Sequence, residues 1–259
     1  MSTVIYPSPI FGPVHSRRLG VSLGINLMPA DGKICTFDCI YCECGFNADH
    51  RPRLHRPTRE EVREKLEQQL VKMVGEGRLP DVLTFAGNGE PTAHPDFKAI
   101  IEDTIQLRNR HCPEARVSVL SNATLAAKPS VREALLMVDN NILKLDTVNA
   151  EYIRRVNAPT GHYDVGEVVE ALKSYHGHVI IQTMFMKGRD MHGMSVDNTG
   201  EEYVGPWIEA VKAIAPQSVM VYTIDRETPD HALLKATHEE LDAIVARVKA
   251  CGIPASASY

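Results

Sequence analysis

The sequence lacks the features of a membrane or secreted protein. No apolar run approaches the roughly 18 residues of a membrane-spanning helix, and the first 18 residues lack the charged-then-apolar layout of a signal peptide. Charge of one sign is not in large excess, because 28 Lys and Arg stand against 33 Asp and Glu and the net charge is −5. The chain therefore has no global basic field for nucleic acid or an anionic membrane. These absences favour a cytoplasmic protein without a membrane partner.

The chain also lacks short repeats, low-complexity tracts and an interdomain linker. Its 259 residues, 44% of them hydrophobic, suit one α/β domain with a large core. We expect a single domain over 1–259, with an N-terminal extension at 1–20 and a short tail at 251–259 that covers the open side of the fold. Two isolated cysteines, Cys112 and Cys251, are expected to be buried as small hydrophobic residues.

Apolar strand segments alternate with helical segments along the chain. In residues 58–77, Val62, Leu66, Leu70 and Met73 recur at helical spacing, and Thr58 precedes them as an N-cap. The strand segments are apolar throughout, which is typical of a parallel sheet covered on both faces. We expect strands at 21–28, 81–87, 116–122, 141–147, 178–186 and 218–224, and helices at 58–77, 95–110, 129–140, 164–175, 201–214 and 237–252.

Such alternation predicts an α/β fold with parallel strands. Because a full barrel needs eight strand–helix units and the sequence has six, we expect an open, partial (β/α)6 TIM-like barrel. A flat doubly wound sheet is the alternative. In either architecture, functional residues gather beyond the carboxyl ends of the strands. The segments at those ends are the cysteine-rich loop, GNGEP (87–91), SNAT (121–124), LDTVN (145–149), MKGRD (186–190) and DRETP (225–229).

Cysteine is scarce, yet four of the six cysteines lie within CTFDCIYCEC (35–44). In a reducing compartment, such clustering indicates metal ligands or catalytic thiols rather than disulfides. Cys35, Cys39 and Cys42 have CxxxCxxC spacing, which suits three corners of an iron–sulfur cube better than the paired CxxC of zinc sites. Three ligands would leave one iron open. Cys44 could be a fourth ligand, but only one residue separates it from Cys42, and we expect it not to be one.

Two stretches carry a family resemblance. GPVHSRRLGVSLGIN (12–26), followed by CTFDCIYC (35–42), resembles radical S-adenosylmethionine (SAM) proteins, most of all the branch of tRNA-wybutosine-type iron–sulfur oxidoreductases. The resemblance implies one 4Fe-4S cluster on Cys35, Cys39 and Cys42, whose open iron binds the amino and carboxylate groups of SAM. It implies reductive cleavage of SAM to a 5′-deoxyadenosyl radical that abstracts a substrate hydrogen. An electron donor such as flavodoxin or ferredoxin would reduce the cluster.

The resemblance also implies a SAM site at the strand ends. GNGEP matches the family's glycine–glycine–glutamate motif, with Asn88 between the glycines. Backbone groups of this loop and the Glu90 carboxylate would hold the methionine ammonium. A glycine-rich turn, a turn asparagine and an internal ion pair are the ordinary alternatives for these positions. The residues expected to bind SAM are Gly87, Asn88, Gly89, Glu90, Asn122 at the ribose or carboxylate, Lys144 at the carboxylate, Asp146 beside Lys144, and Tyr41 and Tyr222 at the adenine.

Two further features stay open. In IQTMFM (181–186), either Gln182 and Met184 or the residues between them would line the pocket, because alternate strand residues face opposite sides. The pair Arg17–Arg18 could bind an acidic substrate group or a cofactor carboxylate, or form a solvated basic edge.

The substrate is not named by the sequence. Wybutosine enzymes carry further cysteines ahead of the main motif, whereas no cysteine precedes Cys35, and no cysteine-rich C-terminal extension follows. We therefore expect a single-cluster enzyme acting on a tRNA, small-molecule or protein substrate. The basic stretch HRPRLHRPTR (50–59) is the one local hint of nucleic acid and also suits a plain surface loop. A glycyl-radical activase is the alternative enzyme. A non-catalytic iron–sulfur electron carrier or zinc-binding module is the third reading, which the GNGEP and SNAT loops disfavour.

Overall fold

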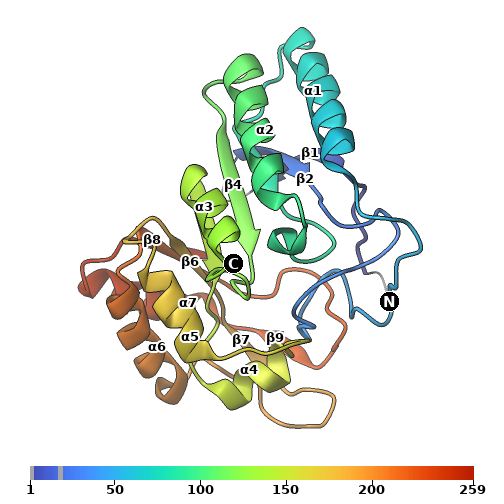
Figure 1. Ribbon diagram of the computed structural model, residues 1–259. Coiled ribbons are helices and arrows are strands. Elements are labelled where there is room, and N and C mark those ends of the chain that lie inside the picture. Colours follow the sequence, from blue (N-terminus) through green and yellow to red (C-terminus); the bar gives the residue numbers. More distant parts are fainter. Residues whose placement is uncertain (1–2, 17–19) are drawn as a thin grey trace.

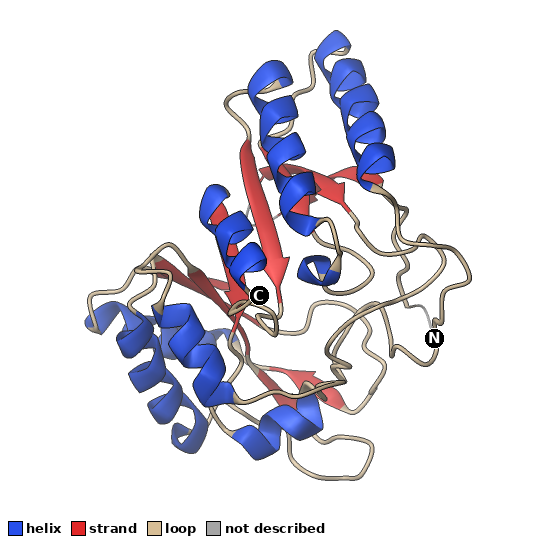
Figure 2. Ribbon diagram, in the orientation of Figure 1, coloured by secondary structure: helices blue, strands red, loops and turns tan. Residues whose placement is uncertain are grey.

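Eight strands of the described residues, 3–16 and 20–259, form one mostly parallel sheet in this computed structural model (Figures 1 and 2). The pair Arg17–Arg18 lies outside the described residues. The strand order is β1-β2-β3-β4-β5-β6-β8-β10; β1 runs antiparallel to β2, and the other neighbours pair in parallel. The strands are β1 Ile10–Ser16, β2 Gly20–Ile25, β3 Val82–Phe85, β4 Arg116–Ser121, β5 Asn140–Lys144, β6 Ile180–Met184, β8 Ser218–Tyr222 and β10 Ala255–Ser258.

Helices pack on the outer side of this sheet (Figure 2). The first of them, α1, is capped by Thr58 in a capping box with Glu61, as its sequence predicts. Its apolar stripe is buried, which fixes the helix against the core. The helices are α1 Arg59–Gly75, the 3₁₀ turn η1 Pro91–Ala93, α2 Phe97–His111, α3 Pro129–Met137, α4 Ala150–Val156, α5 Val165–Lys173, α6 Glu201–Ile214 and α7 His238–Ala250.

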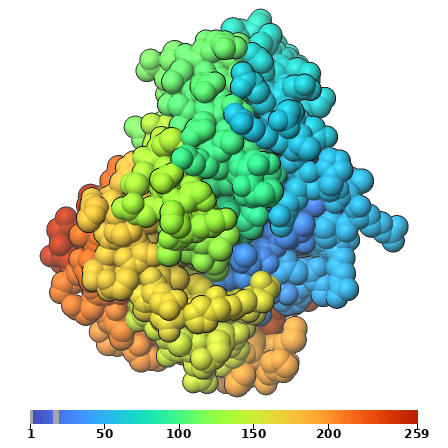
Figure 3. Space-filling view, viewed as in Figure 1, coloured from blue at the N-terminus to red at the C-terminus, as the bar shows by residue number. Residues whose placement is uncertain are grey.

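The strand order confirms a partial barrel rather than a doubly wound sheet. The strands β2, β3, β4, β5, β6 and β8 are neighbours in their chain order, with no reversal, so every crossover advances the sheet in one direction. The six predicted strands and six predicted helices are all present. In Figure 3 the N-terminal half, blue to green, and the C-terminal half, yellow to red, form one continuous body.

The structure also contains elements that the sequence did not predict. Strand β1 lies within the expected N-terminal extension, and β10 lies within the expected C-terminal tail, where it pairs in parallel with β8. Helix α4 has seven residues, too few for a helical periodicity to stand out. A second small sheet joins β7 (Met186–Gly188) to β9 (Leu233–Lys235) in antiparallel pairing.

The core lies between the sheet and its helices. Phe185 meets Trp207 edge to face at a ring separation of 5.4 Å, which anchors α6 to the end of β6. Cys112 is buried, as predicted. The same prediction is wrong for Cys251, which is exposed because it caps the surface end of α7. Among the described residues, no helix combines the length and apolar character needed to cross a bilayer.

The basic stretch 50–59 is tied to the fold at its C-terminal end. Arg59 donates through Nε and Nη2 to both carboxylate oxygens of Asp103, at 2.6 and 2.9 Å, and Arg63 adds a third bond at 3.0 Å. The hydrogen bond and charge of Arg59 lower the pKa of the buried Asp103. This cluster fixes the start of α1 against α2.

Replacement of Asp103 by asparagine is expected to lower the free energy of unfolding by about 1–2 kcal/mol, less than for a fully buried pair because both arginines are partly exposed. Since the folded-state pKa lies below the unfolded value, the stabilisation is complete above about pH 4 and is lost as the pH falls through the lowered pKa. Urea unfolding at pH 7 and pH 3 measures both effects. The control Glu133→Gln breaks an exposed pair with Lys98 and should leave the midpoint unchanged; an Asp103→Asn protein as stable as wild type at pH 7 would contradict this account.

Candidate functional site

A cavity of about 380 Å³ opens at the carboxyl ends of the parallel strands. Its volume falls in the range of small-molecule and cofactor sites. The cysteine loop forms one wall, and the loops after β3, β4 and β8, with the ends of β5 and β6, form the others. Ten of the twelve residues predicted for the site line this space: Cys35, Cys39, Tyr41, Cys42, Gly87, Gly89, Glu90, Asn122, Lys144 and Tyr222.

The three cysteines of the CxxxCxxC motif face this cavity together. Within the described residues, no three His, Cys, Asp or Glu side chains converge as ligands of a single metal ion. A cluster makes a different demand, because each thiolate bonds its own iron and the sulfur atoms need only border a common space. Amide groups approach two of the sulfurs: Nδ2 of Asn122 lies 3.6 Å from Sγ of Cys35, and Nδ2 of Asn157 lies 3.7 Å from Sγ of Cys39.

A buried ammonium supports the cysteine loop from behind. Nζ of Lys33 donates to the carbonyl of Gly45 at 2.6 Å and lies 3.4 Å from Oδ1 of Asp38, and its side chain is 1% exposed. Burial opposes its charge, but the thiolates of the cysteine loop, above all that of Cys42, outweigh burial and raise the pKa of Lys33. Lys33 therefore places a positive charge beside the cysteine sulfurs, a role that its position two residues before Cys35 did not reveal.

Cys44 differs from the other cysteines of the loop. Its Sγ donates to the carbonyl of Gly87 at 3.5 Å. The Cys44 side chain also lies beside Cys42, so its single S–H has two acceptors; this contact lowers the pKa of Cys42 to about 6 and raises the pKa of Cys44. Cys44 thus acts as a thiol donor in this arrangement, while Cys42 is the better thiolate.

The Glu90 carboxylate joins the loop after β3 to the loop after β4. Its Oε1 accepts from Thr92 N–H and Oγ1 and from the Ser121 hydroxyl, at 2.6–3.0 Å, and its Oε2 accepts from the Asn122 N–H at 2.7 Å. Burial raises the pKa of Glu90. Because Oε2 receives a single bond from the described residues, it keeps capacity for one more donor.

Lys144 carries a second charge into the cavity. Its Nζ donates to the Tyr222 hydroxyl at 2.8 Å, lies 3.5 Å from Oδ1 of Asp146, and stands over the rings of Tyr41 and Tyr222. Burial opposes the ammonium, but Asp146 and Tyr222 outweigh it and raise the pKa of Lys144. Asp146 lies behind the cavity wall and also accepts from the Tyr41 hydroxyl and the Met184 N–H.

Two predicted asparagines are engaged by the protein itself. Nδ2 of Asn88 donates to the carbonyls of Tyr6 and Pro29 at 2.8 and 2.9 Å, so this fully buried side chain anchors the N-terminal segment behind the loop. Nδ2 of Asn122 donates to Oγ1 of Thr36 at 2.8 Å in addition to its contact with the cysteine loop. The sequence left open which alternate residues of 181–186 line the pocket, and in the structure Gln182 and Met184 do so.

A polar bridge that the sequence did not reveal crosses the cavity rim. Nη1 of Arg226, in the loop after β8, donates to Oε2 of Glu43 and to the Tyr6 hydroxyl, each at 2.7 Å. The Tyr6 hydroxyl donates in turn to Oε1 of Glu43 at 2.9 Å. The bridge holds the loop after β8 against the cysteine loop, and its three partners lie far apart in the chain.

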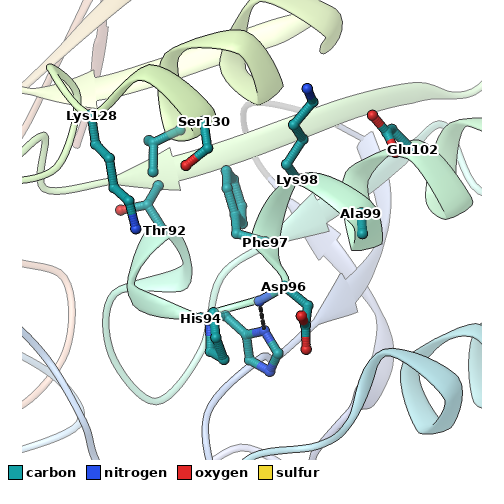
Figure 4. Close-up of a pocket in the computed structure, with 11 residues that line it drawn as sticks. Thr92, His94, Asp96, Phe97, Lys98, Ala99, Glu102, Lys128 and Ser130 are labelled. Carbon is teal, nitrogen blue, oxygen red and sulfur yellow. Dashed lines mark hydrogen bonds between the residues drawn. The ribbon is translucent and has the colours of Figure 1, made fainter.

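A second cavity, of about 320 Å³, lies beside the start of α2 (Figure 4). It contains none of the predicted site residues among its described lining. His94 is the imidazole in this space; its Nδ1 accepts from the Asp96 N–H at 3.1 Å and its Nε2 donates to the Pro57 carbonyl at 2.9 Å. The ring therefore serves as a structural tie between α1 and α2.

Fold and cavity together define a partial α/β barrel with a cysteine-lined site at the carboxyl ends of its strands. A family model described as the Radical SAM superfamily matches residues 31–195, more than half of the chain. The chain belongs to the radical SAM superfamily, as the cysteine motif predicted. Membership implies SAM and an iron–sulfur cluster as cofactors.

The similarity to curated relatives covers more of the chain than residues 31–195. The chain is 29% identical over 238 residues to a protein named GTPase Obg from Brachyspira hyodysenteriae, covering 90% of this chain and 32% of that protein. It is 31% identical over 198 residues to a UPF0026 protein of Methanocaldococcus jannaschii, covering 74% of this chain and 58% of that protein. The chain thus spans less than two thirds of the length of these relatives.

Solved structures share the fold at low sequence identity. A radical SAM methyltransferase from Sphaerobacter thermophilus superposes with a TM-score of 0.66 and 15% identity, covering 92% of this chain and 66% of that one. Streptococcus suis SuiB bound to S-adenosylmethionine superposes with a TM-score of 0.65 and 13% identity, covering 91% of this chain and 50% of that one. Archaeal TYW1 superposes with a TM-score of 0.50 and 12% identity, covering 88% of this chain and 71% of that one. These likenesses confirm the predicted barrel.

Proposed function

We propose that this protein is a radical SAM enzyme with one 4Fe-4S cluster on Cys35, Cys39 and Cys42 and with SAM in the adjoining cavity. The observation that carries the proposal is that three motif cysteines, a carboxylate with a spare acceptor site and the Lys144 ammonium share one 380 Å³ cavity. An electron carrier needs no such cofactor space, and the cavity therefore favours catalysis.

The chemistry of the donor set fits both groups. Three cysteines on one loop supply thiolates, and a fourth cluster position is left for SAM. When bound, the reduced cluster would supply one electron to the SAM sulfonium, giving methionine and a 5′-deoxyadenosyl radical that abstracts a hydrogen atom from the substrate. A flavodoxin or ferredoxin would be the electron donor. The walls of the cavity would exclude water from the radical.

Two charged residues would orient the methionine part of SAM. Oε2 of Glu90 would accept a hydrogen bond from the ammonium, since this oxygen has one protein donor. Nζ of Lys144 would donate to the SAM carboxylate. The Tyr41 and Tyr222 rings that flank Lys144 would pack against the adenine side. Gln182 lies on β6 beside Lys144 and would contact SAM or the substrate.

The direct test is anaerobic turnover. We expect the purified protein, reconstituted with iron and sulfide and given dithionite and SAM, to form 5′-deoxyadenosine detectable by mass spectrometry. Omission of dithionite should abolish the product, because cleavage needs an electron. An iron-loaded protein that binds SAM without any cleavage, with each candidate electron donor, would contradict the catalytic assignment.

Replacement of Lys144 by methionine is expected to weaken SAM binding by about 10–100-fold, the loss of one charged hydrogen bond. The site should persist, because Asp146 keeps donors from Tyr41 and the Met184 N–H. Isothermal titration of the loaded protein with SAM measures the effect, and iron per chain checks that the cluster is retained. The control Lys212→Met removes an exposed lysine of α6 and should bind SAM normally. Equal affinity of Lys144→Met and wild type would remove Lys144 from the SAM site.

A further inference from the structure

A segment that begins at the last residue of α4 backs the cysteine loop. Residues 156–160 (VNAPT) run antiparallel to residues 36–40, and Figure 1 shows the yellow-green connection between α4 and α5 extending toward the blue cysteine loop. The backbone hydrogen bonds, N–H donor first, are Asp38 to Asn157 at 3.0 Å, Ile40 to Val156 at 3.0 Å and Thr160 to Thr36 at 2.9 Å. The backing segment therefore sets the path of the chain between the first two cysteines of the motif.

One side chain of this backing segment reaches the site. Asn157 is 2% exposed, and its Nδ2 lies 3.7 Å from Sγ of Cys39, 2.9 Å from Oη of Tyr41 and 2.8 Å from Oδ2 of Asp146. Asp146 in turn lies 3.5 Å from Nζ of Lys144. A single buried amide thus links the sulfur of a cluster cysteine to the charged pair of the proposed SAM site.

Two of the motif sulfurs receive an amide in this way, from different elements of the fold. Asn122 approaches Cys35 from the end of β4, and Asn157 approaches Cys39 from the end of α4. An amide has two N–H groups, so Asn157 divides them among three acceptors. A cluster-bound thiolate is a stronger acceptor than a thiol, so cluster binding would strengthen the hydrogen bond from the Asn157 amide to the Cys39 sulfur.

We propose that Asn157 is a positioning residue that holds Cys39 from the backing segment and raises the reduction potential of the bound cluster through its N–H···S hydrogen bond. Hydrogen bonds to cysteine sulfur stabilise the reduced, more negative cluster. This inference rests on the proposed function, because it needs a cluster on the three cysteines.

The test replaces Asn157 by leucine, which has a similar shape and no donor. The backbone bonds of the backing segment are independent of this side chain, so we expect wild-type iron per chain. The midpoint potential of the cluster, from an anaerobic redox titration followed by electron paramagnetic resonance, should shift to a more negative value. An unchanged potential in the loaded variant would overturn the proposal.

Further variants protect this test against simple misfolding. A lowered unfolding midpoint of apo Asn157→Leu would show that leucine does not fit; Asn157→Ala then takes its place, with the same expected shift and the same contradicting result. Asn157→Gln keeps an amide and should restore the potential at least in part; a potential as negative as that of the leucine variant would argue against the hydrogen bond. The control Asn149→Asp keeps the N-cap at the far end of α4 and should leave the potential unchanged.

The proposed function and the role of Asn157 are contradicted by different results. If the wild-type protein takes up no iron–sulfur cluster, the proposed function fails. If the wild type loads a cluster and cleaves SAM while every loaded Asn157 variant shares its potential, the proposed function stands and the role of Asn157 falls.

Discussion

Replacement of Cys39 by alanine is expected to abolish both the cluster and SAM cleavage. A cluster with an open iron has three protein ligands, and loss of one leaves two thiolates to hold a cube that needs three. Iron per chain should fall to near zero after reconstitution, the brown absorbance should vanish, and 5′-deoxyadenosine formation should drop by at least about 10³-fold, equivalent to about 4 kcal/mol.

The other cysteines provide matched controls for this variant. Cys44→Ser removes a thiol from the same loop; in the wild type, the Sγ of Cys44 donates to the Gly87 carbonyl. Cys251→Ser removes an exposed thiol from the end of α7. Both should retain iron. Wholesale loss of iron in Cys44→Ser, with retention in Cys39→Ala, would show that the ligand set has been assigned wrongly.

Replacement of Gly89 by alanine is expected to have the second-largest effect. Gly89 has φ +139°, a conformation that L side chains rarely adopt, and a Cβ there would overlap the carbonyl of Ile34, next to Cys35. At this point the GNGEP loop and the cysteine loop meet backbone to backbone, since the Glu90 N–H donates to the same Ile34 carbonyl at 3.2 Å. The strain of about 1–3 kcal/mol must be relieved by moving one loop away from the other.

We expect Gly89→Ala to lose more than about 90% of SAM cleavage, because a displacement of about 1 Å at a reacting site costs roughly 10²-fold in rate. Iron content and SAM affinity, measured together, should show which loop has moved. Gly75→Ala is the matched control: its Cβ meets open space at the end of α1, so activity should be unchanged. A fully active Gly89→Ala protein would exclude a close fit between the two loops.

Sequence patterns located most of the cavity because a parallel sheet gathers the ends of its strands. Each apolar strand ends where polar residues begin, and these ends include Glu90, Asn122, Lys144 and Tyr222, all of which line one space. Alternation along β6 limited the choice to two sets, but which set faces the cavity depends on how the strand sits in the barrel. In the structure, Gln182 and Met184 line the cavity.

Contacts between distant segments were beyond the reach of sequence patterns. Asn157 follows Cys39 by 118 residues, and VNAPT has neither a periodicity nor a turn signal that points to the cysteine loop. Arg226 reaches Tyr6 across 220 residues in the same way. Strand β10 has the sequence ASAS, whose small residues give no strand signal; its conformation depends on parallel pairing with β8.

Electron paramagnetic resonance of the reduced, reconstituted protein, recorded with and without SAM, tests the central claim most directly. The account predicts the signal of one 4Fe-4S cluster whose g values and line shape change when SAM is added, because SAM binds the iron that the three cysteines leave open. A cluster signal that saturating SAM leaves unchanged would contradict the account, since it would mean that the fourth iron is closed or that SAM does not bind in this cavity.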